Sequence, residues 1–147
     1  ENKARSLGCN WLTLDSAAAT SPAVAAHPDA PRLLVIDRRW LAEERPALKR
    51  LVFLFECLAE VPGVEIRVGD PAALLAARAG ALGCDAVVVA DTPCPAVRGA
   101  AATLAGALPV HVVAWPPFCD RSRVDDLGRF SRYWQRVSRS ALRPTGS

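Results

Sequence analysis

The sequence has few of the residues that build metal or redox centres. Its two histidines, His27 and His111, are far apart, and none of its cysteines forms a C-x-x-C pair. The cysteines are odd in number and scattered, at Cys9, Cys57, Cys84, Cys94 and Cys119. This pattern predicts reduced thiols in a cytoplasmic protein, with no metal site and no disulfide framework.

Long apolar stretches are also missing. No run approaches the 18–20 apolar residues that a membrane-spanning helix needs. The opening ENKARSLGCNWLTL has no apolar core of the signal-peptide type. Residues 1–8 are expected to form a tail.

Motifs that would indicate nucleotide binding or catalysis are absent as well. The sequence contains no G-x-G-x-x-G, no G-x-x-x-x-G-K-[ST] and no G-x-S-x-G. The nearest candidate nucleophile is Cys94 in DTPCP, where a following helix N-terminus would lower its pKa. A structural cysteine beside a turn is the favoured interpretation, so we predict no catalytic residue.

Charge is distributed unevenly along the chain. Residues 121–147 hold seven arginines and two aspartates, whereas residues 1–120 hold eleven basic and thirteen acidic residues. A basic C-terminal segment after a mildly acidic remainder is only weak evidence for nucleic-acid binding. In domains that bind nucleic acid, basic residues usually dominate the charge of the whole domain. Any contact with DNA is expected to be weak and non-specific.

What the sequence does contain is a regular alternation of strand-like and helix-like segments. The predicted strands are Asn10–Leu14, Leu33–Asp37, Val64–Val68, Ala86–Ala90 and Val110–Ala114. Runs such as LLVID and AVVVA are typical of strands buried on both faces of a parallel sheet. The predicted helices cover Pro46–Glu60, Pro71–Leu82 and Pro95–Leu108, and Asp70 can cap the second of them.

This alternation predicts the α/β class with a single domain over residues 1–147. We expect a Rossmann-like, doubly wound, five-stranded parallel sheet in three α/β/α layers. The segment SAAATSPAVAAHPDAP is expected to be a loop with a short helical turn.

An amphipathic helix is predicted over residues 125–143. Leu127, Phe130, Trp134, Val137 and Ala141 recur at helical spacing on one face, and arginines form a second stripe. The apolar face is expected to pack on the sheet. The stripe could simply keep the helix soluble, or it could bind a partner through Arg129, Arg132, Tyr133 and Arg136.

Acidic residues follow the predicted strands. Asp15, Asp37, Asp70 and Asp91 stand at or just past strand ends, with Arg38 beside Asp37. Ligands of open α/β sheets bind at this edge, although loop acids are also ordinary helix caps.

The order of the segments resembles the N-terminal α/β domain of the DNA photolyase/cryptochrome family over roughly residues 9–140. CNWLTLDSAAATSPAVAA stands where the family has a strand followed by R-x-D-L-R and D-N-P-A-L, and TSPAV resembles the last of these. RLLVIDRRWL, PALKRLVFLFECLAEV and VHVVAWPPF resemble later segments, and GRFSRYWQRV resembles the aromatic, basic lead into the second domain. The R-x-D-L-R segment has no counterpart, because Ser16 and alanines follow Asp15.

This resemblance implies an accessory module with an antenna chromophore, a folate or a deazaflavin, near Asp15, Asp37, Arg38, Asp70 and Asp91. The family's helical FAD domain has no counterpart here, so no FAD is expected in this chain alone. The implied partner is a flavin-binding helical subunit, or a second copy of the chain.

Two alternatives stay open beside this accessory role. The chain could be one part of a light-dependent DNA repair enzyme, a deoxyribodipyrimidine photolyase. It could instead be a nucleotide-binding domain of the universal-stress or electron-transfer-flavoprotein type. That type needs a glycine-rich loop after the fourth strand, where this chain has VADTPCPAVRGAA with Gly99 alone.

Overall fold

The computed structural model describes residues 8–119, 122 and 128–142, in two compact units that span Glu1–Trp115 and Pro116–Ser147. Of the described helices, none has the length and apolar character needed to cross a membrane.

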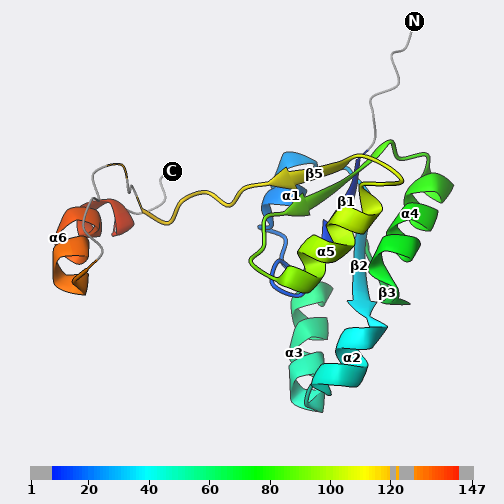
Figure 1. Cartoon of the computed structure of the whole chain (residues 1–147), viewed down its shortest axis with the longest axis horizontal. Coiled ribbons are helices and arrows are strands. Elements are labelled where there is room, and N and C mark those ends of the chain that lie inside the picture. Colours follow the sequence, from blue (N-terminus) through cyan, green and yellow to red (C-terminus); the bar gives the residue numbers. More distant parts are fainter. Residues whose placement is uncertain (1–7, 120–121, 123–127, 143–147) are drawn as a thin grey trace, which may run out of the picture. The chain divides into compact units, whose positions relative to one another are not determined.

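The first unit is built on a parallel sheet. Its strands are β1 (Gly8–Leu12), β2 (Arg32–Asp37), β3 (Val64–Gly69), β4 (Ala86–Ala90) and β5 (Val110–Val113). They lie in the order β3-β2-β1-β4-β5, and every neighbouring pair is parallel (Figure 1). This arrangement confirms the predicted Rossmann-like α/β fold.

Helices connect the strands. They are α1 (Pro22–Ala26), α2 (Arg38–Glu44), α3 (Leu48–Ala59), α4 (Pro71–Leu82) and α5 (Pro95–Leu104). Asp70 caps α4 as predicted, because its side chain accepts a hydrogen bond of 2.8 Å from the backbone N–H of Ala73. Gly83 ends the same helix with a φ of 66°, a left-handed conformation that costs glycine little.

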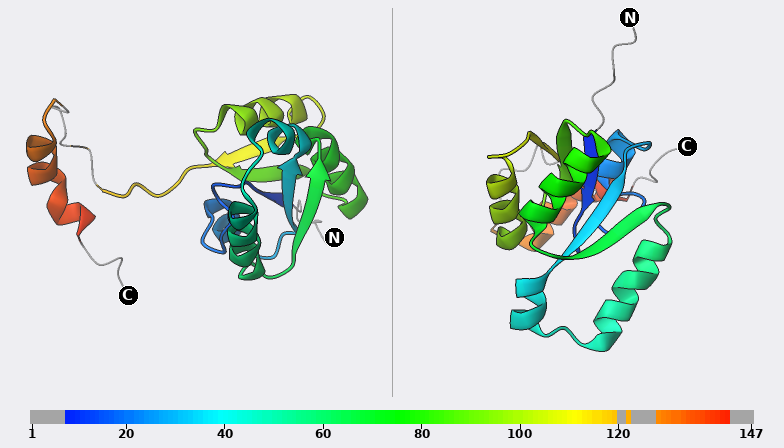
Figure 2. Two further views of the ribbon diagram at one scale, coloured as in Figure 1. Left: turned by 90° about the horizontal axis from the view of Figure 1, so that it is seen from below. Right: turned by 90° about the vertical axis from the view of Figure 1, so that its right-hand side faces the viewer.

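The two faces of the sheet bury alternate side chains of the same strands. Trp11 and Leu33 belong to a core that also includes Leu75 of α4 and Leu104 of α5. Leu12 and Leu34 belong to the opposite core, with Val24 of α1 and with Leu54 and Leu58 of α3. Helices therefore cover both faces, which gives the predicted three layers (Figure 2).

Several local features differ from the sequence prediction. Helix α3 begins at Leu48 rather than Pro46, and α5 ends at Leu104 rather than Leu108. Helix α2 was not expected; it forms because Asp37 caps it. It ends at Glu44, and the capping residue Arg45, which precedes Pro46, has a left-handed φ of 42°. Strand β1 ends at Leu12 rather than Leu14, because the N–H of Thr13 donates to the Ser16 hydroxyl at 3.1 Å instead of continuing the sheet. The strand also begins at Gly8, the last residue of the expected tail.

The second unit contains α6 (Phe130–Ala141), which confirms the amphipathic C-terminal helix. Residues 125–127 and 143 of the predicted span lie outside the described residues. Phe130 and Trp134 stack with ring centroids 6.0 Å apart, and Val137 is buried. Whether Phe130 and Trp134 pack on the sheet, and whether the two units form one domain, stay predictions.

Candidate functional site at the strand ends

The connections that follow two neighbouring strands, β1 and β4, leave the sheet on opposite faces. The chain moves outward from β1 through β2 to β3, and then from β4 to β5 on the other side of β1. The loop after β1 leads to α1 on one face, while the loop after β4 leads to α5 on the other. Doubly wound sheets bind ligands in the crevice where such loops part.

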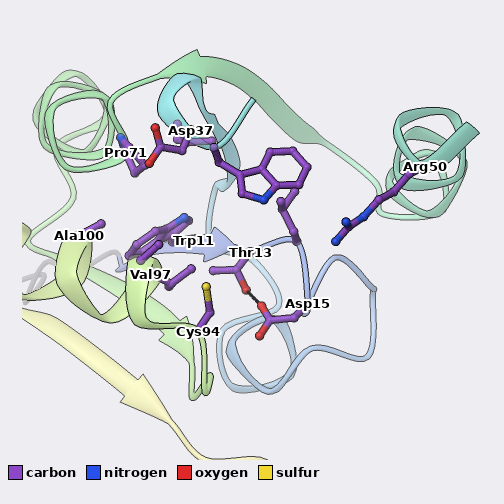
Figure 3. A pocket seen from close by; sticks show the side chains of 13 residues that line it. Trp11, Thr13, Asp15, Asp37, Arg50, Pro71, Cys94, Val97 and Ala100 are labelled. Atoms are coloured by element: carbon purple, nitrogen blue, oxygen red, sulfur yellow. Dashed lines mark hydrogen bonds between the residues drawn. The ribbon is translucent and has the colours of Figure 1, made fainter. Parts of the chain in front are cut away.

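A cavity of about 250 Å³ lies at this point; we call it the strand-end cavity. Much of its wall is apolar, including Trp11, Val35, Val97 and Ala100, and Figure 3 shows it between the ends of the strands and the first turns of the helices. An apolar cleft with a few placed polar groups is the usual form of a small-molecule site.

Asp15 is the first polar group of this cavity, and hydroxyls hold it in place. One carboxylate oxygen accepts from the Thr13 hydroxyl (Figure 3), and the other accepts from the hydroxyl of Thr92, which follows β4. The Thr13 and Ser16 hydroxyls lie 2.8 Å apart. The carboxylate thus bridges the loops that follow β1 and β4.

Asp37 is the second carboxylate of the cavity. It is the last residue of β2, and its Oδ1 accepts a hydrogen bond of 2.8 Å from the backbone N–H of Arg39. This hydrogen bond caps α2 and fixes the side chain beside the cavity, with Oδ2 making no hydrogen bond to any described residue.

Trp40 of α2 and Arg50 of α3 complete the polar and aromatic rim. The Arg50 guanidinium carbon lies 5.5 Å from the centroid of the Trp40 ring, which is within cation–π range. Arg50 extends from α3 toward the loop that carries Asp15 (Figure 3), and it forms no ion pair with any residue in the described part of the chain.

Cys94 also lines the cavity, although the sequence favours a purely structural role for it. It occupies the N-cap position of α5 without a side-chain cap, and its backbone N–H donates to the Thr92 hydroxyl at 3.1 Å. A thiol at a helix N-terminus inside a cavity can contact a bound ligand.

The structure brings together some of the predicted ligand residues and separates others. Asp15 and Asp37 line the strand-end cavity, whereas Arg38 and Asp70 line a more open hollow beside it that Asp37 shares. Asp91 pairs with Arg98 at 3.4 Å, outside the strand-end cavity. The ligand role of all five remains a prediction.

Sequence reasoning missed Trp40 and Arg50. Trp40 stands three residues after Asp37 in IDRRWL, and its position one turn into a capped helix is a signal that could have been used. Arg50 carries no such signal, since only the packing of α3 brings it to the cavity.

The predicted partner residues Arg129, Arg132, Tyr133 and Arg136 are assigned to the second unit. The three arginines are exposed, and Tyr133 is half-buried with its hydroxyl 3.3 Å from the Cys119 sulfur. Binding of a partner by this surface stays a prediction.

No protein-family model matches the chain, and no curated protein matches it significantly. Among solved structures, the chain is similar to that of the hypothetical protein MJ0577. That structure is described as a test case for assigning biochemical function from structure. That match has 16% identity and a TM-score of 0.41, and it covers 77% of this chain and 99% of the other. Likeness at this level supports no statement about function.

These findings overturn the resemblance to the photolyase/cryptochrome family. No family model and no curated protein supports it. The segments that suggested photolyase are strand, turn and helix units that any doubly wound sheet repeats in this order. The implied antenna chromophore, flavin-binding subunit and repair activity lose their basis with it.

Proposed function

We propose that this chain is a binding module that holds a nucleoside or mononucleotide in the strand-end cavity. The observation that carries the proposal is the convergence of the half-buried indole of Trp40 and two carboxylates on an apolar cavity at the switch point of the sheet. This proposal retains the nucleotide-binding alternative raised by the sequence.

Trp40 supports the placement of the base. It lines the cavity and is half-buried, so part of its ring is accessible. Stacking of a nucleobase on such a ring contributes about 1–3 kcal/mol.

Asp37 supports the placement of the sugar. An acid after the second strand of a dinucleotide-binding fold accepts hydrogen bonds from ribose hydroxyls. Asp37 occupies this position, and its Oδ1 is already used by the Arg39 N–H. The Oδ2 atom is the acceptor that the proposal assigns to the ribose.

The segment after β4 limits how many phosphates the site can hold. It reads Asp91-Thr92-Pro93-Cys94-Pro95, so the first residue of α5 is a proline without a backbone N–H. Arg98, one turn later, donates to the Thr92 carbonyl at 2.6 Å. With no glycine-rich cradle, Arg50 is the lining cation that remains for a phosphate, which favours a nucleoside or monophosphate over a triphosphate.

The test is calorimetric titration of the full chain with adenosine, AMP and ATP. Asp37→Asn keeps the capping ability of the side chain but removes its charge, so it should weaken adenosine binding about tenfold or more. Asp70→Asn is the matched control, because Asp70 also caps a helix at this edge but does not line the cavity. Absence of binding to all three compounds, or equal weakening by both variants, would contradict the proposal.

A further inference from the structure

A second cavity adjoins the first and shares with it residues of the loop that follows β1. It measures about 280 Å³, and we call it the α3 cavity because Leu51, Phe53, Leu54 and Cys57 of α3 line it. Its wall also includes Ala17, Ala18 and Trp115. The nucleoside proposed above leaves this cavity unused.

The two cavities share a wall. Leu14, Asp15, Trp40 and Arg50 line both of them. Each cavity alone is slightly smaller than the roughly 300–1,000 Å³ of ordinary ligand clefts, whereas the two joined fall within that range. The geometry therefore suits one ligand with two bulky ends and a linker that crosses the shared wall.

The α3 cavity is suited to an aromatic end. Phe53 is 66% exposed and Trp115 is 44% exposed, so both leave ring surface in water that a ligand would cover. The Trp115 indole N–H donates to the Asp91 carbonyl at 2.9 Å, which fixes this ring at the carboxyl edge of the sheet. A planar base can stack against such rings whatever its identity.

The shared wall is suited to an anionic linker. Arg50 belongs to both cavities and has no carboxylate partner in the described residues, so its guanidinium can bind phosphate oxygens. Asp15 forms no ion pair with that guanidinium, and its two oxygens accept hydrogen bonds from the hydroxyls of Thr13 and Thr92.

We infer that the two cavities together form one site for a dinucleotide, that is, two nucleosides joined by a pyrophosphate. One nucleoside lies at Trp40 and Asp37, the pyrophosphate lies at Arg50, and the second base lies in the α3 cavity at Phe53 and Trp115. This inference rests on the nucleoside site proposed above and adds the second half of its ligand.

The experiment compares adenosine, AMP, NAD⁺ and diadenosine diphosphate by calorimetry on the full chain. We expect at least one of the two dinucleotides to bind about tenfold tighter than AMP, since one more stacked base is added. Phe53→Ala should remove this gain and leave AMP binding unchanged. Arg50→Gln should weaken AMP and the dinucleotides but spare adenosine.

Phe55→Ala is the matched control. Phe55 is a second exposed phenylalanine of the same helix, and it lines neither cavity. Circular dichroism checks that both variants fold. If AMP binds but neither dinucleotide binds more tightly, or if Phe53→Ala and Phe55→Ala behave alike, the inference is wrong while the nucleoside site stands. If no adenosine compound binds, both proposals are wrong.

Discussion

The five free cysteines differ in how deeply their thiols are buried. Cys9 is completely buried in β1, and this burial, followed by the neighbouring Cys84, raises the pKa of its thiol to about 11. Burial also raises the pKa of Cys84, with Asp85 adding to the effect. Cys57 and Cys94 are half-buried and line the cavities described above.

We predict that iodoacetamide at pH 8 alkylates Cys57 and Cys94 well before Cys9. The thiolate is the reacting form, and a pKa of about 11 in place of 9.0 leaves Cys9 about a hundredfold less of it. Peptide mass spectrometry over time measures the rates, and guanidinium-unfolded protein serves as the control in which all cysteines react. Equal rates for Cys9 and Cys94 in the folded protein would show that β1 is not buried as described.

An ionic cluster joins two elements, β3 and α4. Glu65 of β3 accepts from Arg67 at 2.6 Å and from Arg78 of α4 at 2.7 Å. These hydrogen bonds, that of Arg67 first, lower the pKa of the Glu65 carboxyl. The cluster therefore stabilises the fold above the ordinary glutamate pKa of about 4.3, and the stabilisation is lost as the pH falls through the lowered value.

Glu65→Gln tests this contribution. We expect it to lower the melting temperature at pH 7 by about 2–4 °C, because partly exposed ion pairs contribute on the order of 1 kcal/mol or less. The difference from the unsubstituted protein should shrink as the pH falls below about 4.3. Glu56→Gln on α3 is the control, since Glu56 is exposed and forms no ion pair within the described residues. A difference that stays constant with pH would rule out an ionic origin.

At the scale of the whole molecule, we expect α6 to unfold together with the sheet. We predict that Trp134→Ala lowers the melting temperature by about 4–8 °C, because Trp134 is 37% exposed and the rest of its surface is covered. Thermal unfolding followed by circular dichroism measures this change. A thermally silent substitution would mean that the apolar face of α6 contributes nothing to the fold.

Arg132→Glu combined with Arg136→Glu is the companion variant. It should change the melting temperature little, as exposed substitutions usually do, and it should weaken self-association measured by sedimentation. An unchanged sedimentation profile in a protein that self-associates would remove the arginine stripe as the partner surface.

The architecture was largely predictable because its signals are local. Runs such as LLVID and AVVVA are typical of strands buried on both sides in a parallel sheet, and the helical segments between them supply the cover. The cap at Asp70 follows from the same kind of short-range pattern. The boundary of β1 was misplaced, because the Ser16 hydroxyl accepts the backbone N–H of Thr13, which then does not continue the sheet.

The candidate site depended on long-range packing. Acids at strand ends could be predicted, yet the order β3-β2-β1-β4-β5 decides which of them share a cavity. That order brings Asp15 to Thr92, and the packing of α3 brings Arg50 to Trp40. The resemblance to photolyase failed for the related reason that many folds share this sequence of elements. Local periodicity therefore determined the class of fold, whereas the tertiary structure alone decided which distant side chains meet, because no short-range pattern encodes their contact.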